Sequence, residues 1–374
     1  MEPTEVFLRE AGSVLTIDLA ALVSNWHTLQ AVSGTECGAV VKADAYGLGL
    51  ERVARALLEA GCKTFFTGHV FEGRALRAIA PDAIIYVLNG IRPGSEFIFA
   101  DFQLRPVLGS VPQMEDWGQF CATSGKRAAD GSLLKAALQL DTGVNQLGLK
   151  AYDLERADHL APLFDVTLLL GQLAIADNDL AERQIEAFDA MRARYPGKPA
   201  SIANSAAIFL DTNPPLYELV RPGYALYGGN PVPGRPNPMR PVVKLEAQIV
   251  QVRVLEPGQG VGEEQRWIAK GPRRIIMVAA GLADGIPAGL TRNEKNRGGE
   301  ALVQGTRCPY VSKIAMDYSV IDVSDATYLE RGEWVELIGK TVTIDEFAAA
   351  AAGLSGYEIL TRLGQRAHRR YQAI

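Results

Sequence analysis

The sequence lacks several features that would place a protein in a class at once. No apolar run approaches the roughly 20 residues that a membrane-spanning helix requires. The net charge of −5 gives no excess of basic residues, which argues against nucleic acid or an anionic membrane as a partner. The acidic segment 1–5 does not have the basic-then-apolar pattern of a signal peptide. We therefore expect a cytoplasmic protein with neither a membrane nor a nucleic-acid partner.

Cysteine and histidine are scarce, at four residues each in a chain of 374. The cysteines are Cys37, Cys62, Cys121 and Cys308, and the histidines are His27, His69, His159 and His368. Neither set has the short, paired spacing that metal ligands usually show. The sequence therefore predicts reduced thiols and no metal site.

The most regular feature of residues 13–230 is an alternation of short apolar runs with helical patterns. Between the runs, apolar residues recur three or four positions apart, as at Ile185, Phe188 and Met191. Repeated units of this kind imply parallel strands joined by helices, and eight of them predict a (β/α)8 TIM barrel. The eight runs are 38–43, 64–70, 83–88, 105–108, 136–140, 166–173, 200–204 and 219–221.

Polar residues stand at or just past the ends of these runs. They are Lys42, Asp141, Gln172, Asn204 and Arg221. The carboxyl ends of the strands in such a barrel face the active site. We therefore expect these side chains to share one face of the barrel.

A proline-rich stretch, 231–238, cannot continue a helix or a central strand and reads as a linker. Beyond it the apolar runs become mostly strand-like, with one helical pattern at 344–352. The prediction is a barrel domain over 1–236 and a mostly antiparallel β domain over 237–374. Residues 1–12 are the part of the first domain that could instead pair with the second.

The stretch from Ala39 to Gly47 delivers a single lysine, Lys42, from an apolar strand into a polar turn. Such a lysine is either a solvated strand end or a reactive amine. An uncharged amine can form a Schiff base with an aldehyde. This stretch alone does not decide between the two.

Separated motifs along the whole chain resemble those of one family, the alanine racemases. The lysine motif is Val40–Gly47, and the motif near the cofactor is Leu140–Asn145. The two cradle motifs are Ala203–Ser205 and Val220–Gly223. The two late motifs are Ala315–Asp317 and Gly356–Glu358.

The resemblance implies a role for each matching residue. Lys42 would carry pyridoxal 5′-phosphate (PLP) as a Schiff base and act as one acid/base at the substrate Cα. Arg221 would face the pyridine nitrogen and keep it unprotonated, which favours proton exchange over transamination. The cofactor cradle would comprise Tyr46, Asn204, Ser205, Gly223, Tyr224 and Tyr357. Gln146 and Met316 would lie at the amino-acid substrate, and Asp317 would join the catalytic residues. The resemblance also implies a head-to-tail homodimer whose active site is shared between subunits.

The positions that depart from the family motifs are those expected to transfer protons or to lie near the cofactor and substrate. The family's second base is the first tyrosine of a Gly-Tyr-Ala-Asp-Gly-Tyr motif, and Leu282 stands in its place. A leucine cannot transfer a proton. Gln146 replaces an arginine, Gln172 replaces a histidine that supports the Arg221 position, and Glu263 belongs to an altered segment at the active-site mouth.

Three functions remain open on these residues. The first is a racemase-type isomerase acting at Cα, with an altered substrate or a substitute base among Tyr310, Tyr318, Lys313 and Glu263. Of these, Tyr318 is expected to be packed. The second is another PLP enzyme: an aldolase, a transaldolase or a one-base epimerase. The third is a non-catalytic PLP-binding paralogue.

Overall fold

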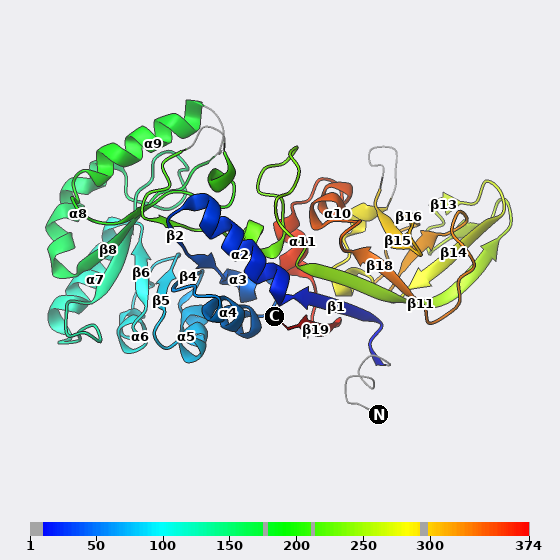
Figure 1. The fold of residues 1–374 in the computed structure, drawn as a ribbon, viewed down its shortest axis with the longest axis horizontal. Coiled ribbons are helices and arrows are strands. Elements are labelled where there is room, and N and C mark those ends of the chain that lie inside the picture. Colours follow the sequence, from blue (N-terminus) through cyan, green and yellow to red (C-terminus); the bar gives the residue numbers. More distant parts are fainter. Residues whose placement is uncertain (1–9, 175–178, 211–213, 292–297, 374) are drawn as a thin grey trace. The chain divides into compact units, whose positions relative to one another are not determined.

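The computed structural model describes residues 10–174, 179–210, 214–291 and 298–373, which divide into two compact units (Figure 1). The first unit comprises residues 23–226 and 230–239. The second comprises residues 227–229, residues 240 onwards and the start of the chain up to residue 22. The sequence predicted a boundary at 236–237 with the start of the chain in the first domain. The structure instead places the start of the chain, up to residue 22, in the second unit.

The first unit is a parallel β-barrel. Seven strands pair in the order in which they occur along the chain: β3 (Ala39–Val40), β4 (Thr64–Thr67), β5 (Ile84–Val87), β6 (Arg105–Leu108), β7 (Lys135–Gln139), β8 (Asp165–Leu170) and β9 (Ala200–Ser201). Strand β10 (Leu219–Val220) pairs with β2 (Glu36–Cys37), which runs on into β3. The N–H of Arg221 donates to the carbonyl of Ala203 at 2.9 Å, and that of Val40 to Pro222 at 3.0 Å.

These bonds close the barrel by seating β10 between β9 and β3. With β2 and β3 taken as one interrupted strand, the described residues form the eight strands of a (β/α)8 barrel, which confirms the predicted fold class.

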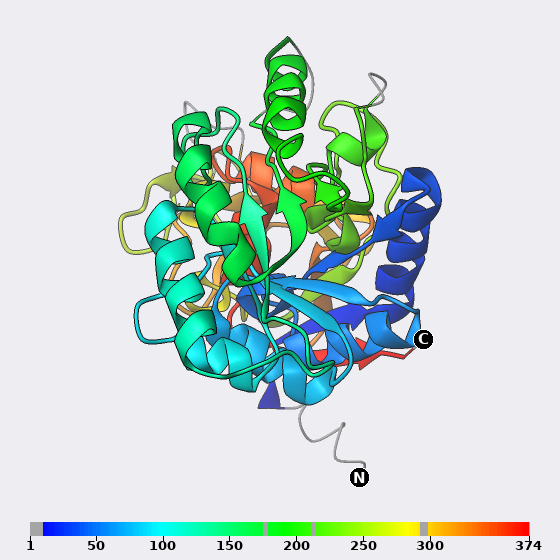
Figure 2. The same ribbon diagram turned by 90° about the vertical axis from the view of Figure 1, so that its left-hand side faces the viewer.

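Helices surround these strands (Figure 2). They are α2 (Leu19–Ser33), α4 (Leu50–Glu59), α5 (Val70–Ile79), α6 (Glu96–Asp101), α7 (Val111–Thr123), α8 (Leu154–Leu160) and α9 (Asp179–Arg192). Helix α4 shows why these helices pack against the strands: one face is apolar and the other is charged. It buries Val53 and Leu57, while Glu51 and Arg55 form an exposed pair at 3.0 Å. Each fully buried aliphatic side chain contributes about 1.5–3 kcal/mol, and a surface pair contributes far less.

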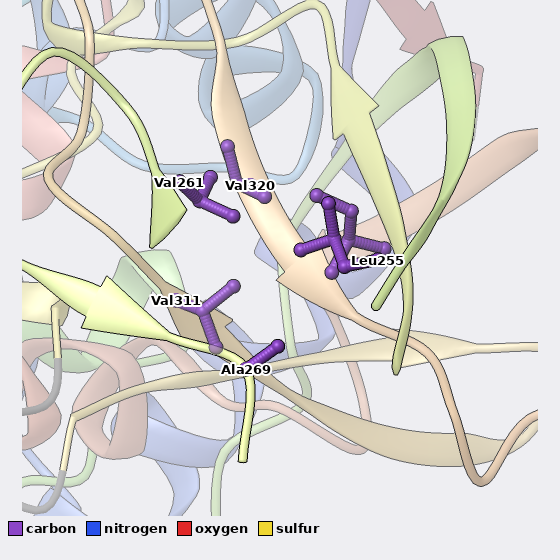
Figure 3. Close-up of a cluster of buried hydrophobic side chains, with 6 residues drawn as sticks. Leu255, Val261, Ala269, Val311 and Val320 are labelled. Carbon is purple, nitrogen blue, oxygen red and sulfur yellow. The ribbon is translucent and has the colours of Figure 1, made fainter. Parts of the chain in front are cut away.

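The second unit is built on an eight-stranded sheet in the order β14-β17-β16-β15-β18-β11-β1-β19. The long strand β11 (Val243–Leu255) also pairs with β14 (Arg273–Val278), which curls part of the sheet into a second barrel. The other strands are β15 (Glu300–Val303), β16 (Thr306–Val311), β17 (Ser319–Asp322) and β18 (Trp334–Ile338). A separate two-stranded ladder joins β12 (Gly260–Val261) to β13 (Trp267–Ile268). Leu255, Val261, Ala269, Ile275, Val311 and Val320 form one apolar core of this unit (Figure 3).

Both ends of the chain join this second sheet. Strand β1 (Ser13–Asp18) pairs antiparallel with β11 and parallel with β19 (His368–Gln372). The carbonyl of Gly12 accepts the N–H of Gln248 at 2.9 Å, so the pairing begins one residue earlier. The expected pairing of residues 1–9 lies outside the described residues. A parallel partner 354 residues away leaves no local signal, and periodicity alone does not assign β1 to this sheet.

Two helices complete the second unit, α10 (Ile344–Ala350) and α11 (Gly356–Arg362). The Thr343 hydroxyl caps α10 by accepting the N–H of Glu346. None of the helices in the described ranges is long and apolar enough to cross a membrane.

Candidate active site

Lys42 opens a turn with an unusual backbone. One residue, Val41, separates it from β3, and it starts the short element α3 (Lys42–Tyr46). The next four residues have φ between 53° and 57°, namely Ala43, Asp44, Ala45 and Tyr46. Left-handed backbone costs a non-glycine residue about 1–2 kcal/mol, so the surrounding contacts must enforce this turn. The Asp44 carboxylate accepts the N–H of Leu50 at 2.7 Å and supplies one of them.

A close-packed cradle lies beside this turn. Tyr46 is buried, and a Cβ on Gly223 would fall only 2.2 Å from its hydroxyl oxygen. The buried hydroxyl of Ser205 accepts the N–H groups of Gly223 at 3.0 Å and Ala225 at 3.2 Å. The structure thus brings Tyr46, Ser205 and Gly223 together from three separate motifs.

Asn204 and Tyr224 frame this cradle in different ways. The Asn204 side-chain oxygen accepts the N–H groups of Ala206 at 3.1 Å and Ala207 at 3.2 Å, so it shapes the turn that carries Ser205. Tyr224 is buried and begins a 3-10 turn, Tyr224–Tyr227. Hydroxyls and backbone N–H groups at the ends of barrel strands are the donors that a phosphate group requires. The residues present therefore fit the phosphate of PLP.

Arg221 is a buried cation held by neutral acceptors. Its guanidinium donates to the Ser201 carbonyl and hydroxyl at 2.7 and 2.6 Å, and to the Gly171 carbonyl at 2.7 Å. The Gln172 side-chain oxygen accepts a longer bond, at 3.3 Å. Burial lowers the pKa of Arg221 to about 10, so it stays protonated at neutral pH. Gln172 thus contacts Arg221 at the edge of this neutral pocket.

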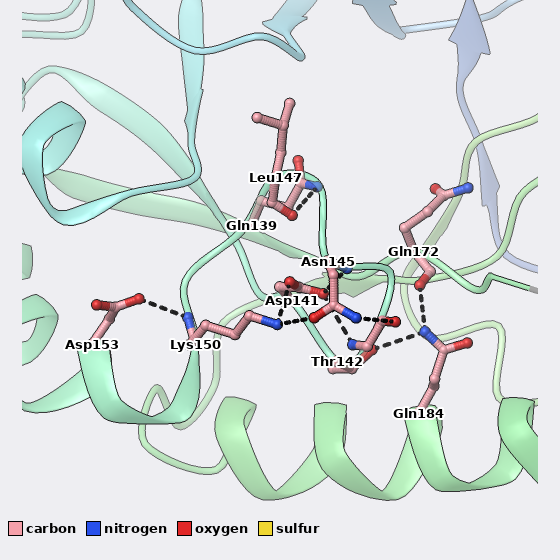
Figure 4. Close-up of polar contacts among 10 residues, drawn as sticks. Gln139, Asp141, Thr142, Asn145, Leu147, Lys150, Asp153, Gln172 and Gln184 are labelled. Carbon is pink, nitrogen blue, oxygen red and sulfur yellow. Dashed lines mark hydrogen bonds and ion pairs between the residues drawn. The ribbon is translucent and has the colours of Figure 1, made fainter.

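The loop after β7 is organised around Asp141 (Figure 4). The buried carboxylate accepts the N–H groups of Gly143 at 3.0 Å and Asn145 at 3.1 Å, and it pairs with Lys150 at 2.8 Å. Burial raises the pKa of Asp141, but the bonds from Lys150, Gly143 and Asn145 outweigh it and hold the pKa below its ordinary value. Gln146 is exposed on the same loop.

Gln184 is a structural residue that the sequence reasoning missed. Its side chain lies fully buried on α9 and accepts the N–H of Ala174 at 2.9 Å. It also donates to the Gln172 carbonyl at 3.1 Å and to the Thr142 hydroxyl at 3.5 Å (Figure 4). It therefore ties together the loops after β7 and β8. The sequence did contain a signal for it. Gln184 lies one helical turn before Phe188 and two turns before Met191, so its amide falls on the apolar face of the helix.

In the second unit, the turn that carries Leu282 packs directly on the loop that carries Met316. Leu282 N–H donates to the Ala315 carbonyl at 2.9 Å, and Ala283 N–H to the Met316 carbonyl at 3.0 Å. A Cβ on Gly281 would lie 2.4 Å from the Ala315 carbonyl oxygen, so only glycine permits this approach. Leu282 is 41% exposed and Met316 is 62% exposed. Both side chains are therefore presented to the surface of the unit.

Arg366 holds the same two loops together. It donates to Asp317 at 2.8 Å and lies 3.7 Å from the buried carboxylate of Asp284. Asp317 is thus an ion-pair partner in this unit. Tyr357, on α11, is 47% exposed; burial, and then the charge of Asp345, raise its pKa.

The candidate substitute bases have different environments. Tyr310 is fully buried on β16, its hydroxyl finds no hydrogen-bond partner among the described residues, and burial raises its pKa. Lys313 pairs with Glu264 at 2.8 Å, and Glu263 is exposed. Tyr318 is 46% exposed, which corrects the expectation that it is packed. It ends the loop beside Leu282, because its carbonyl accepts the N–H of Ala315 at 3.0 Å.

Across the ranges that the structure covers, no group of three His, Cys, Asp or Glu side chains is placed to hold a metal ion. All four cysteines are buried thiols. Burial raises the pKa of Cys37 and of Cys121 to about 12 each. These thiols are therefore packing residues at neutral pH.

Comparisons with known proteins agree across both units. The family model "Alanine racemase, N-terminal domain" matches residues 17–231, and "Alanine racemase, C-terminal domain" matches residues 242–371. An alanine racemase of Methylobacterium nodulans is 48% identical over 96% of each chain. One of Acidiphilium cryptum is 42% identical over 95% of this chain and 97% of its own. The solved structure of an alanine racemase from Bartonella henselae, with covalently bound pyridoxal phosphate, superposes with a TM-score of 0.89. It is 35% identical and aligns over 97% of this chain and all of its own.

Proposed function

The chain belongs to the alanine racemase family of PLP-dependent isomerases, and from that membership we propose that Lys42 binds PLP and exchanges the Cα proton of an amino acid. The observation that carries this proposal is the strained turn after Lys42 beside the Tyr46–Ser205–Gly223 cradle. A solvated strand end needs neither feature. Strain of this kind persists where the surroundings enforce it, as they do at functional sites.

Each residue of the barrel site has a defined task. Tyr46, Ser205 and the backbone at Gly223 and Tyr224 would hold the phosphate, with the Ser205 hydroxyl fixed in place by the Gly223 N–H. Arg221 stays charged and would face the ring nitrogen without giving up a proton. PLP would supply electron withdrawal at Cα, and the Lys42 amine would take and return the proton on one face.

This chain differs from a two-base racemase in the residue expected to serve the second face of the substrate Cα. Racemisation requires a proton acid/base on both faces, and Leu282 can neither give nor take a proton. We infer that the chain exchanges the Cα proton on the Lys42 side and acts on a substrate other than alanine or by a substitute base. Aldol cleavage of a β-hydroxy amino acid is the second candidate, because it uses the same one-sided site.

One experiment separates these functions. The purified protein is incubated in deuterated water with the L and D forms of alanine and of other amino acids, and each product is analysed for both chirality and deuterium at Cα. The proposal predicts deuterium incorporation into one enantiomer with retained configuration, or with slow formation of the other enantiomer. Fast racemisation in both directions would contradict the proposal that the chain lacks an effective base on the second face of Cα. A protein that binds PLP but exchanges no amino acid tested would favour the non-catalytic alternative.

Leu282→Tyr tests the missing base directly. We expect the tyrosine to raise D-alanine formation by about 10²–10⁴-fold, the range that one positioned acid/base contributes. Leu282→Phe is the matched control, because it adds the ring without the hydroxyl. Equal rates in the two variants would show that the loss of this hydroxyl does not limit racemisation.

We also propose a head-to-tail homodimer in which loops of the second unit complete the site of a partner. The exposed Leu282 and Met316 side chains on one rigid pair of loops support this arrangement. Sedimentation equilibrium and the Cα exchange rate are measured over the same dilution series. Activity should fall as dimer is lost, whereas a fully active monomer would refute the shared site.

A further inference from the structure

Glu72 is a nearly buried carboxylate that the roles assigned above leave unexplained. It lies in the first turn of α5 and is 8% exposed. One carboxylate oxygen accepts the N–H of Ala43 at 2.7 Å. The other accepts the N–H groups of Gly68 at 2.7 Å and His69 at 2.9 Å. Its three partners therefore come from the loops that follow two neighbouring strands, β3 and β4.

Helix capping accounts for only one of these bonds. His69 is the N-cap of α5, and a glutamate three residues later that accepts its N–H completes a capping box. The bonds to Gly68 and Ala43 lie outside the helix. Ala43 directly follows Lys42 and is the first residue of the left-handed turn, with a φ of 53°. Glu72 thus holds the peptide group that leaves Lys42 in a backbone conformation that alanine rarely adopts.

The same carboxylate fixes a wall beside the lysine side chain. A Cβ built on Gly68 would meet the Lys42 Cβ at 3.5 Å and the nearer Glu72 oxygen at 3.2 Å. The Gly68 backbone therefore lies alongside the aliphatic stem of Lys42, and Glu72 holds that backbone by its N–H. Both the peptide after Lys42 and the surface against its stem depend on one carboxylate.

We propose that Glu72 is a positioning residue that sets the direction of the Lys42 amine. This inference rests on the proposed function of Lys42. One carboxylate oxygen accepts a hydrogen bond from the loop after β3, and the other accepts two from the loop after β4. A glutamine offers an acceptor on one side only, and its NH2 group would face an N–H donor on the other. Glu72→Gln should therefore release one of the two loops while keeping the size of the side chain.

The test compares the holoenzyme forms of wild type, Glu72→Gln and Glu96→Gln. Glu96 is a matched control because it lies in the first turn of α6 and accepts the N–H of Gly94 at 3.2 Å, away from the Lys42 loop. The measurements are the visible circular dichroism of the bound cofactor, and kcat and KM for Cα deuterium exchange on the amino-acid enantiomer that the wild type exchanges fastest. We expect Glu72→Gln to change the dichroism band and lower kcat by about 10–100-fold with little change in KM, as a misplaced reacting group does. Glu96→Gln should match wild type in all three.

The outcomes separate this inference from the proposed function. A wild-type protein without a visible cofactor band would defeat the proposed function itself. A normal wild-type band with unchanged dichroism and kcat in Glu72→Gln would overturn the positioning role alone. If Glu72→Gln does not fold, Glu72→Asp is measured in the same way, because it keeps the charge but is one methylene too short to span both loops. Wild-type dichroism and kcat in Glu72→Asp would also overturn the proposal.

Discussion

Gly223→Ala is the substitution whose effect follows most directly from the geometry of the cradle. The added Cβ would lie 2.2 Å from the Tyr46 hydroxyl oxygen and 3.0 Å from the ring carbon that bears it. The third contact, at 3.4 Å to Val40, is ordinary. Tyr46 must therefore move by about 1 Å to restore a normal van der Waals separation.

Tyr46 has little freedom to make that movement. It is 5% exposed and has a φ of 57° at the end of the Lys42 turn. Overpacking of a buried site typically costs about 1–3 kcal/mol of unfolding free energy. Displacing the hydroxyl also removes one hydrogen bond to a charged phosphate, about 1.5–3 kcal/mol, which weakens PLP binding about 10–100-fold.

The assay is equilibrium titration of the apoprotein with PLP, followed by the visible band, together with thermal unfolding. Gly271→Ala is the matched control, because a Cβ there meets no atom within 4 Å and its φ lies outside the left-handed region. If Gly223→Ala binds PLP as tightly as Gly271→Ala, then the cradle described here does not hold the phosphate.

Two further predictions concern other parts of the chain. Asp141→Asn should lower the unfolding free energy at pH 7. The pKa of the folded Asp141 is depressed, so its stabilisation is present above the unfolded pKa of about 3.9 and disappears as pH falls through the folded value. Urea unfolding of both proteins from pH 7 to pH 3 checks this, and a gap between them that widens towards acid would contradict it. Tyr318 is an exposed candidate for a substitute base on the loop beside Leu282, and we assign it that role. Tyr318→Phe should then reduce any residual D-alanine formation while leaving Cα exchange intact, whereas the buried Tyr310→Phe should leave the ratio of the two rates unchanged. A ratio that moves only in the Tyr310 variant would reverse this assignment.

The sequence predicted those parts of the structure that repeat or that local pattern controls. The alternation of apolar runs and helical spacing predicted the (β/α)8 barrel, and the helical pattern at 344–352 begins at the same residue as α10. Lys42, Arg221 and Gly223 could be selected because strand ends and family motifs mark them.

What the sequence did not reveal depends on contacts between distant segments. Nothing in Ala43 and Ala45 signals a left-handed turn, since glycine is the usual marker of that backbone. Glu72 resembles an ordinary capping residue until its bond to Ala43 is seen, 29 positions away. The position of Tyr318 suggested packing, yet its side chain is exposed on the loop beside Leu282.

The central claim is that Lys42 is the residue that binds the cofactor. Reduction of the purified protein with borohydride converts a lysine-bound Schiff base into a stable secondary amine, which peptide mass spectrometry can locate. We predict that the visible band is bleached and that the pyridoxyl group lies on Lys42, with neither the band nor the adduct in Lys42→Ala. An adduct on another lysine, or a band that survives in Lys42→Ala, would contradict it.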